Sequence, residues 1–260
     1  MQTHPLLSTP HTAALDGRTA VVTGAASGIG AAAARRFVAA GARVALVARR
    51  GDRLDALVDE LGADRALAAA ADVTDPAALD AAGALVADRL GPVDLVVANA
   101  GVMLPAPLEE LRVDEWRRMV DLNLVGVLET VRVFLPALLE TGERRGVADL
   151  MLTSSLGARA TFPGYAVYGA TKAAVSYLAG AWRAELAPRG VRVTVVEPGL
   201  TDSELAGNVA HAGQAEELAG MFDAIPALRA ADVADLLAYT AALPARAGLP
   251  SLSILPSRQA

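Results

Sequence analysis

The chain has 260 residues, a net charge of −6, 53% hydrophobic residues and no cysteine. This length suits one large domain or two small ones, and the lack of cysteine excludes disulfides, thiolate nucleophiles and cysteine-based metal sites. The acidic charge argues against nucleic acid as a partner. There is no run of 18 uncharged apolar residues and no basic segment followed by an apolar one at the N-terminus. We therefore expect no membrane span, no signal peptide and a cytoplasmic protein.

Residues 1–16 contain two prolines, two histidines and little periodicity, and they predict a disordered extension. His4 and His11 are expected to be solvated tail residues rather than metal ligands, and no metal site is predicted. Neither an internal repeat nor a linker-like segment divides the remainder of the chain. We therefore predict that residues 17–260 form a single domain.

From residue 18 onward, short β-branched runs alternate with stretches of helical spacing. The predicted strands are Thr19–Thr23, Val44–Val47, an alanine-rich and weaker Arg65–Ala71, Val93–Ala98, Val147–Thr153, Val191–Val196 and Ser251–Leu255. The predicted helices between them include Ile29–Ala40, Pro76–Leu90 with Asp75 as N-cap, and Ala231–Ala242. This alternation predicts an α/β fold: a single doubly wound Rossmann-type domain with a mainly parallel sheet of about seven strands and helices on both faces.

A glycine-rich segment, residues 23–30, lies between the first predicted strand and the first predicted helix. Glycines let the backbone turn tightly and approach a pyrophosphate, while the helix N-terminus supplies amide donors and the positive end of a dipole. The spacing differs from GxGxxG, and a plain tight turn is the alternative. In this context we interpret the segment as a nucleotide-binding turn, with contacts from Thr23, Gly24, Ser27, Gly28, Ile29 and Gly30.

Two arginines, Arg49 and Arg50, follow the second predicted strand. An NAD site commonly places an acidic residue here to bind the ribose 2′-hydroxyl, whereas arginine accommodates a 2′-phosphate. Because Ala48 stands where the acid is expected, we predict that NADP(H) is preferred over NAD(H). The alternative is that Arg49 or Arg50 merely caps the strand at a solvated edge of the sheet.

Other predicted strands also end in residues that could contact a cofactor. Open α/β sheets bind ligands at the carboxyl ends of their strands. Asp72 and Val73 follow the third predicted strand, and Asn99, Ala100 and Gly101 follow the fourth. Each is also an ordinary turn residue, so the prediction depends on their shared position at this edge.

Lys172 is the only lysine among 23 Lys+Arg residues, and it follows Tyr168 by four positions. Residues at this spacing share one face of a helix. An ammonium beside a phenol lowers the pKa of the phenol toward working pH, which makes tyrosine a usable acid or base. The alternative is an ordinary helix pair in an arginine-biased sequence.

Taken together, the motifs resemble the short-chain dehydrogenase/reductase family over residues 17 to about 255. They occur in the family's order: Thr23-Gly-x-x-x-Gly-x-Gly30, Asp72-Val73, Asn99-Ala-Gly101, Asn123, Ser155, Tyr168-x-x-x-Lys172 and Pro198-Gly199. Residues 165–172 and 190–205 are similar to a bacterial NADP-dependent group that contains clavaldehyde dehydrogenase and 3-hydroxy acid dehydrogenases. The chain departs from the family at Ala98, where a second asparagine is usual.

The resemblance implies a catalytic set of Asn123, Ser155, Tyr168 and Lys172. Tyr168 would donate its proton to the developing alkoxide during carbonyl reduction, and Ser155 would polarise the substrate carbonyl. Lys172 would lower the pKa of Tyr168 and hold the nicotinamide ribose, so both residues also count as cofactor contacts. Asn123 would anchor a water that links Lys172 to solvent.

Each of these assignments has an alternative among neighbouring residues. Ser154 should point to the opposite side of the extended chain from Ser155. Tyr165 lies seven residues before Lys172, two helical turns away. Asn123 could instead kink or cap a helix.

By the same resemblance, the segment after the last core strand completes the site. It implies nicotinamide contacts from Pro198, Gly199, Thr201 and Ser203, and a substrate lid over residues 204–230. In that lid, His211 is expected to be solvated. Apolar candidates for the pocket are Met103, Leu104, Leu156, Phe162, Pro163 and Leu200, with Val209, Met221 and Phe222 either on the lid's inner face or in a helix core. Because no arginine is obviously aimed at an anionic substrate, we expect a neutral or weakly polar carbonyl substrate.

The leading hypothesis is an NADP(H)-dependent carbonyl reductase or alcohol dehydrogenase. A catalytically silent NADP(H)-binding sensor or scaffold on the same fold is one alternative, and epimerisation or dehydration is another. Relatives commonly pair two long helices across two-fold axes, here about 123–140 and 165–187. We therefore expect a homodimer or homotetramer.

Overall fold

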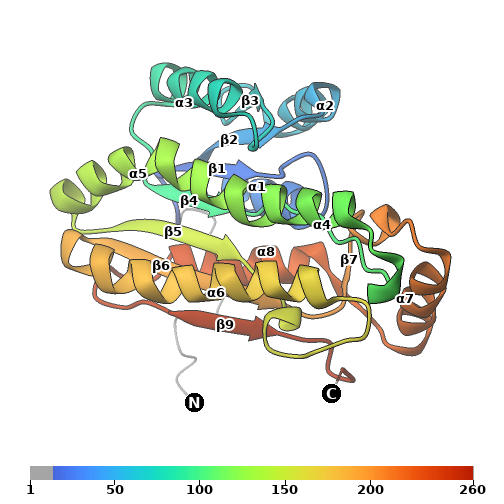
Figure 1. The fold of residues 1–260 in the computed structure, drawn as a ribbon. Helices are drawn as coiled ribbons and strands as arrows, with labels where there is room; N and C mark the ends of the chain where they lie inside the picture. The colour runs from blue at the N-terminus through green and yellow to red at the C-terminus, as the bar shows by residue number, and fades with distance from the viewer. Residues whose placement is uncertain (1–13, 260) are drawn as a thin grey trace, which may run out of the picture.

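The computed structural model describes residues 14–259, which form a seven-stranded parallel sheet between two layers of helices (Figure 1). The strand order is β3-β2-β1-β4-β5-β6-β9. In chain order the strands are β1 Thr19–Thr23, β2 Arg43–Ala48, β3 Ala66–Ala70, β4 Leu95–Ala98, β5 Ala148–Thr153, β6 Val191–Pro198 and β9 Ser251–Ile254. The order reverses between β1 and β4, which creates a switch point where such sheets bind ligands. The predicted doubly wound fold is confirmed.

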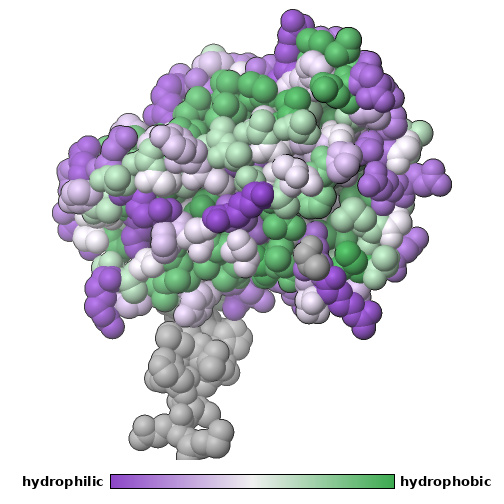
Figure 2. All heavy atoms as spheres, turned by 60° about the horizontal axis from the view of Figure 1, so that its bottom comes forward, coloured by the Kyte–Doolittle hydropathy of each residue, from purple (hydrophilic) through white to green (hydrophobic). Residues whose placement is uncertain are grey.

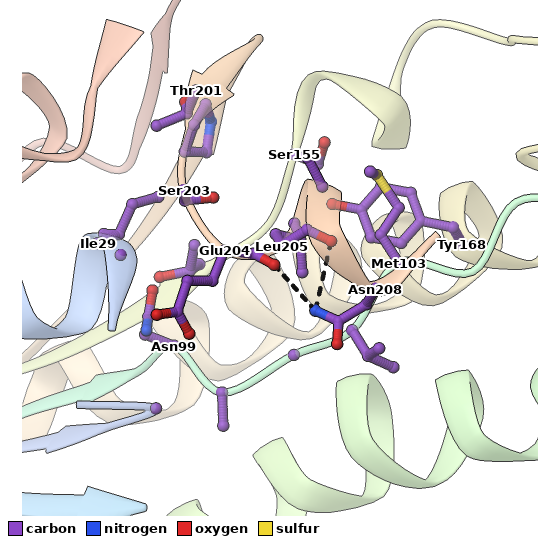
Figure 3. Close-up of a pocket in the computed structure, with 18 of the residues that line it drawn as sticks. Ile29, Asn99, Met103, Ser155, Tyr168, Thr201, Ser203, Glu204, Leu205 and Asn208 are labelled. Carbon is purple, nitrogen blue, oxygen red and sulfur yellow. Dashed lines mark hydrogen bonds between the residues drawn. The ribbon is translucent and has the colours of Figure 1, made fainter. Parts of the chain in front are cut away.

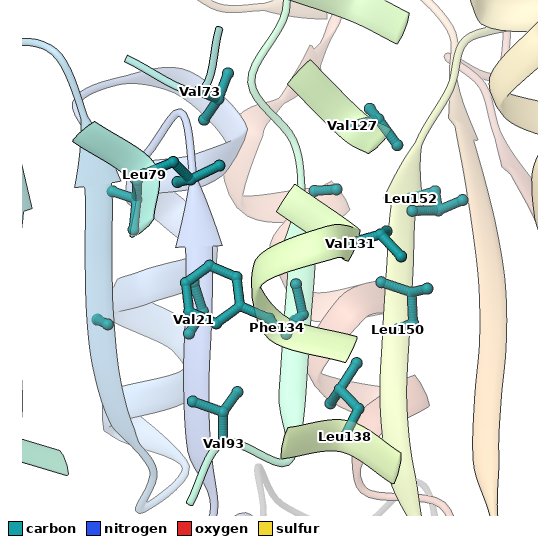
Figure 4. Close-up of a cluster of buried hydrophobic side chains, with 14 of the residues drawn as sticks. Val21, Val73, Leu79, Val93, Val127, Val131, Phe134, Leu138, Leu150 and Leu152 are labelled. Atoms are coloured by element: carbon teal, nitrogen blue, oxygen red, sulfur yellow. The ribbon is translucent and has the colours of Figure 1, made fainter. Parts of the chain in front are cut away.

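Helices cover both faces of the sheet because successive strand residues point to opposite sides. One hydrophobic cluster joins the sheet to α1 Gly28–Ala39, α2 Gly51–Leu61 and α8 Ala230–Ala241. The other joins it to α3 Pro76–Leu90, α5 Gly126–Arg145 and α6 Ala166–Leu186. Figure 4 shows this second cluster, in which Val131 and Phe134 of α5 lie over the strands that carry Val21 and Leu150.

The helix predicted to begin at Asn123 begins earlier. It starts as α4 (Val113–Val120), passes through the π-helical turn Asp121–Val125 and continues as α5. By length and composition this segment, Val113–Arg145, is apolar enough to cross a membrane. A single helix of this kind is weak evidence of a membrane span, because the core helices of soluble proteins meet the same criterion. Here α5 packs on the sheet.

Part of the predicted extension packs against the folded domain. Leu15 is only 1% exposed, and its N–H donates a hydrogen bond to the carbonyl of Ala40 at the end of α1. Residues 15 and 16 therefore belong to the folded part rather than to an extension. His4 and His11 lie outside the described residues. Within residues 14–259 no group of histidine, aspartate and glutamate side chains could hold a metal.

Candidate active site

A pocket of about 700 Å³ opens at the carboxyl ends of the central strands (Figure 3). Three of the four predicted catalytic residues line it: Ser155, Tyr168 and Lys172. Its walls also contain most of the predicted cofactor contacts, namely Gly24, Ser27, Gly28, Ile29, Arg49, Arg50, Asp72, Val73, Asn99, Ala100, Gly101, Pro198, Gly199, Thr201 and Ser203. Among the predicted catalytic and cofactor residues, three do not line the pocket: Thr23, Gly30 and Asn123.

The glycine-rich turn fits a dinucleotide pyrophosphate. Gly24 and Gly28 have φ values of +68° and +52°, which residues other than glycine rarely adopt. A Cβ on Gly30 would collide with the carbonyl oxygen of Gly24. The N-terminus of α1 has no acidic residue in its first turn, and the Ser27 side chain does not cap it. Its amide groups and dipole are therefore free to bind an anion.

Thr23 supports this turn from behind the pocket wall. Its hydroxyl accepts hydrogen bonds from the N–H groups of Asn99 (2.9 Å) and Ala100 (3.1 Å). The Asn99 amide returns a bond to the carbonyl of Thr23 (3.1 Å). These contacts fix the ends of β1 and β4 side by side, so Thr23 acts on the shape of the turn.

A basic cluster lies beside the turn at the end of β2. Arg50 donates to the Ser27 hydroxyl over 2.9 Å, and the guanidinium of Arg49 lies 3.8 Å from the Asp72 carboxylate. Arg53, in the first turn of α2, and Arg50 both donate to Glu204. Guanidinium groups beside a serine hydroxyl suit a phosphate group.

Lys172 and Tyr168 lie on the buried face of α6, as their spacing predicts. The Lys172 ammonium donates to the carbonyl of Thr153 (2.9 Å) and lies 5.9 Å from the centre of the Tyr168 ring. Burial lowers the pKa of Lys172 to about 8. Burial has the opposite effect on Tyr168, because it disfavours the charged phenolate and so raises the pKa. The Ser155 hydroxyl lowers this pKa, but by less. The pKa of Tyr168 is thus raised rather than lowered as predicted, because desolvation of the phenol dominates.

Ser155 and its alternative Ser154 lie in different environments. Ser154 donates to the carbonyl of Lys172 over 2.8 Å and also contacts the Ser176 hydroxyl at 2.8 Å, so α6 engages its side chain. Ser155 follows β5 and accepts a hydrogen bond from the N–H of Gly157 (3.1 Å). In Figure 3 the Ser155 hydroxyl lies on the same side of the pocket as the Tyr168 ring.

Tyr165, the alternative phenol, also lines the pocket but sits in an aromatic contact. Its ring meets Phe162 edge to face, with the centroids 6.1 Å apart. Burial raises the pKa of Tyr165, and the nearby Glu217 carboxylate raises it further.

Asn123 lies in the π-helical turn and is completely buried. Its side-chain oxygen accepts from the N–H of Val102 (2.7 Å), and its amide donates to the Val102 carbonyl (2.9 Å) and to the Thr171 hydroxyl (3.1 Å). A Cβ on Gly101 would lie 3.1 Å from the Asn123 oxygen and 3.4 Å from the Lys172 nitrogen. Asn123 and Lys172 therefore both lie next to Gly101, and Asn123 is behind the pocket wall. The helix also changes from α-helical to π-helical geometry at Asn123.

The predicted lid, residues 204–230, begins just after β7 (Thr201–Asp202), which pairs in parallel with β8 (Leu228–Arg229) near the end of the lid. Between them, α7 (Ala212–Ala224) contributes Met221 and Phe222 to the pocket, whereas Val209 does not line it.

His211 is not the solvated residue that was expected. Its Nδ1 accepts from the N–H of Gln214 (3.0 Å), capping α7, and its Nε2 lies 2.7 Å from the Glu110 carboxylate.

The other apolar residues that were predicted to line the pocket do so with one exception. Met103, Leu156, Phe162, Pro163 and Leu200 line the pocket. Leu104 does not, because it is buried behind the pocket with Val102, Met119 and Tyr168.

Several pocket residues were not named individually from the sequence. Glu204, Leu205, Ala206, Gly207, Asn208, Glu217 and Leu218 lie within the predicted lid, whereas Arg118 and Leu122 lie outside every segment predicted for the site. Arg118 bears on the expectation that no arginine is aimed at an anionic substrate, because it lines the pocket. It lies on α4, five residues before Asn123. Extending the predicted helix by three turns toward the N-terminus would have placed it near the site.

Comparison with known proteins agrees with this geometry. The family model for short chain dehydrogenases matches residues 18–214. The chain belongs to the short-chain dehydrogenase family. It is 38% identical to sulfoacetaldehyde reductase 2 of Chromohalobacter salexigens over 92% of this chain and 94% of the relative. It is 33% identical to an NADP-dependent 3-hydroxy acid dehydrogenase of Salmonella typhi over 92% and 95%, a type of enzyme in the predicted bacterial group.

Solved structures of the same family share this architecture. The closed form of a serine dehydrogenase complexed with NADP+ is 32% identical, superposes with a TM-score of 0.85, and is matched over 93% of this chain and 96% of that one. Family membership makes the chain an oxidoreductase of the short-chain dehydrogenase type.

Proposed function

We propose that the protein is an NADP(H)-dependent carbonyl reductase, reversible as an alcohol dehydrogenase, in which Tyr168 is the general acid and base. The observation that carries this proposal is a single pocket in which Ser155, Tyr168 and Lys172 meet a glycine-rich turn. Arg50 and Ser27, at the adenosine end of the same turn, support NADP(H) over NAD(H).

Each side chain has a distinct task in this proposal. Tyr168 gives its phenolic proton to the carbonyl oxygen as the alcohol forms, and Ser155 donates a hydrogen bond to that oxygen. Lys172 stabilises the phenolate left behind, and Asn123 fixes the loop at Val102 beside it. The nicotinamide would supply the hydride. In reduction the substrate thus gains one hydride at carbon and one proton at oxygen.

The walls favour an aldehyde or ketone of mixed polarity. Met103, Phe162, Met221 and Phe222 supply apolar surface, while Arg118 and Glu217 add opposite charges. Relatives are named for sulfoacetaldehyde, serine and 3-hydroxy acids. We therefore extend the expected substrates from neutral carbonyl compounds to small ones that carry a charged group.

Steady-state oxidation of NADPH tests the proposal with aldehydes, ketones, β-keto esters and charged small carbonyl compounds, with NADH in parallel. Turnover with NADPH preferred is expected, and Tyr168→Phe should remove it while NADPH still binds. Turnover retained by Tyr168→Phe would contradict the mechanism. NADPH binding without turnover on any substrate would favour a sensor or scaffold, and product formed without net NADPH oxidation would favour epimerisation or dehydration.

Location and assembly complete the proposal. We assign the protein to the cytoplasm and to a homo-oligomer built on α5 and α6. Exposed apolar side chains on these helices support the assembly: Val125 just before α5, Leu128 on α5, and Tyr177 on α6, which is 78% exposed. Burying such side chains is the usual driving force of two-fold association.

A further inference from the structure

The basic cluster at the end of β2 already holds a carboxylate of the chain's own. Glu204 accepts a hydrogen bond from Arg50 over 2.8 Å through one oxygen and from Arg53 over 2.5 Å through the other. Arg50 also donates to Ser27. One carboxylate therefore bridges two guanidinium groups immediately beside the turn that would receive a dinucleotide.

Glu204 reaches this cluster from the beginning of the predicted lid. It follows the short strand β7, and its neighbour Ser203 lies against the glycine-rich turn, where a Cβ on Gly28 would be 3.1 Å from the Ser203 Cβ. The two arginines hold the pKa of Glu204 below its usual range, so the side chain is ionised at neutral pH. In Figure 3 the Glu204 side chain is drawn next to Asn99, on the side of the pocket that carries Ile29.

A ribose 2′-phosphate and the Glu204 carboxylate need the same donors. The phosphate carries more negative charge and more acceptor oxygens than a carboxylate, so it can displace Glu204 from the guanidinium groups. A ribose 2′-hydroxyl has no charge to do so, and a dinucleotide without the phosphate leaves the Glu204 contacts intact.

We infer that Glu204 is a specificity-determining residue that competes with the 2′-phosphate for Arg50 and Arg53 and thereby reduces the preference for NADP(H) over NAD(H). This rests on the proposed function, which places the 2′-phosphate at the same arginines. Removing the Glu204 charge should strengthen binding of ligands that carry a 2′-phosphate and leave other adenosine ligands unaffected.

Calorimetric titration of the full chain with 2′,5′-ADP and with 5′-AMP, neither of which needs a substrate or turnover, tests this. Glu204→Gln and Glu204→Ala should bind 2′,5′-ADP about threefold to tenfold more tightly than the parent, the range expected for two half-exposed ion pairs. Their affinity for 5′-AMP should not change. The gain should shrink as salt is added, because exposed ion pairs are screened.

Glu216→Gln is the matched control, since Glu216 is an exposed carboxylate on α7 that does not line the pocket. It should bind both ligands as the parent does. Unchanged or weaker 2′,5′-ADP binding by the Glu204 variants would overturn the inference. If neither the parent nor the variants bind 2′,5′-ADP or NADPH, the proposed NADP(H) function itself fails, and the inference fails with it.

Discussion

At the scale of single residues, the most unusual feature is an ammonium buried beside a phenol. Lys172 is 5% exposed, and burial lowers its pKa from 10.5 to about 8. Between pH 8 and pH 10.5, Lys172 is protonated in the unfolded chain but has lost its proton in the folded chain. The free energy of unfolding should therefore rise with pH across this window, by roughly 2 to 3 kcal/mol from this group.

Urea denaturation from pH 7 to 10 of the parent and of Lys172→Met would measure this contribution. The parent should gain stability relative to Lys172→Met as the pH rises through 8, because the variant has no proton to lose. Parallel pH profiles for the two proteins would show that the buried ammonium costs no folding energy.

Gly30 allows a second prediction about a single residue. A Cβ there would collide with the backbone carbonyl of Gly24, which cannot move without opening the turn. Gly30→Ala should therefore lower the free energy of unfolding by about 2 kcal/mol and weaken NADPH binding. Gly220→Ala is the control, because nothing lies within 4 Å of a Cβ at that position in α7. It should stabilise the helix by about 0.5 to 1 kcal/mol. Equal stability of Gly30→Ala and the parent would contradict this reading of the turn.

At the scale of elements, a buried carboxylate joins the end of β6 to α6 and β9. Glu197 is fully buried and accepts hydrogen bonds from Arg159 (2.7 Å), Ser176 (3.0 Å) and Ser253 (3.0 Å). Ser176 in turn contacts Ser154, which holds the backbone of Lys172. The network thus ties α6, which carries Tyr168, to the strands beneath it.

Arg159→Ala should destabilise the protein by about 1 to 3 kcal/mol, since it removes the only cation within salt-bridge distance of Glu197 among the described residues. Adding Glu197→Gln should recover part of this loss, because the amide carries no charge to desolvate. Thermal unfolding of the two single variants and the double variant measures the coupling. Additive losses would show that the two side chains act independently.

The elements also show what the sequence could and could not predict. β-Branched runs and the Asp75–Pro76 cap, whose aspartate accepts from the amides of Ala77 and Ala78, gave the strands and α3 correctly. β3 is nearly all alanine and is held by its pairing with β2 rather than by its own propensity. The π-helical turn and the β7–β8 pair have no local pattern, because they depend on contacts between distant segments.

The same contrast holds within the site. Their spacing predicted that Tyr168 and Lys172 share one face of a helix, since four residues span about one helical turn. The contact between Arg50 and Glu204 joins positions 154 residues apart in the chain. Nothing in the sequence near either residue indicates the other. Likewise, only the packed structure shows that burial raises the pKa of Tyr168.

At the scale of the whole molecule, the surface bears on assembly. Figure 2 shows hydrophobic residues interspersed with hydrophilic ones over the face it presents, which is ordinary for a folded domain. Two of the exposed apolar side chains lie on α5 and α6, where Leu128 and Tyr177 are 41% and 78% exposed. The same helices pack on the sheet through their buried residues, so their outer sides are free to contact a second copy.

We therefore expect light scattering after gel filtration to give a mass two or four times that of the 26.6 kDa chain. Tyr177→Glu should shift the population toward monomer, because it places a charge at the centre of an apolar contact. Tyr239→Glu is the control, since Tyr239 is exposed on α8 on the other side of the sheet. A monomeric parent, or equal effects of the two substitutions, would contradict assembly through α5 and α6. If only Tyr177→Glu dissociates the protein, that surface is the interface, and the pocket remains open at the strand ends of each copy.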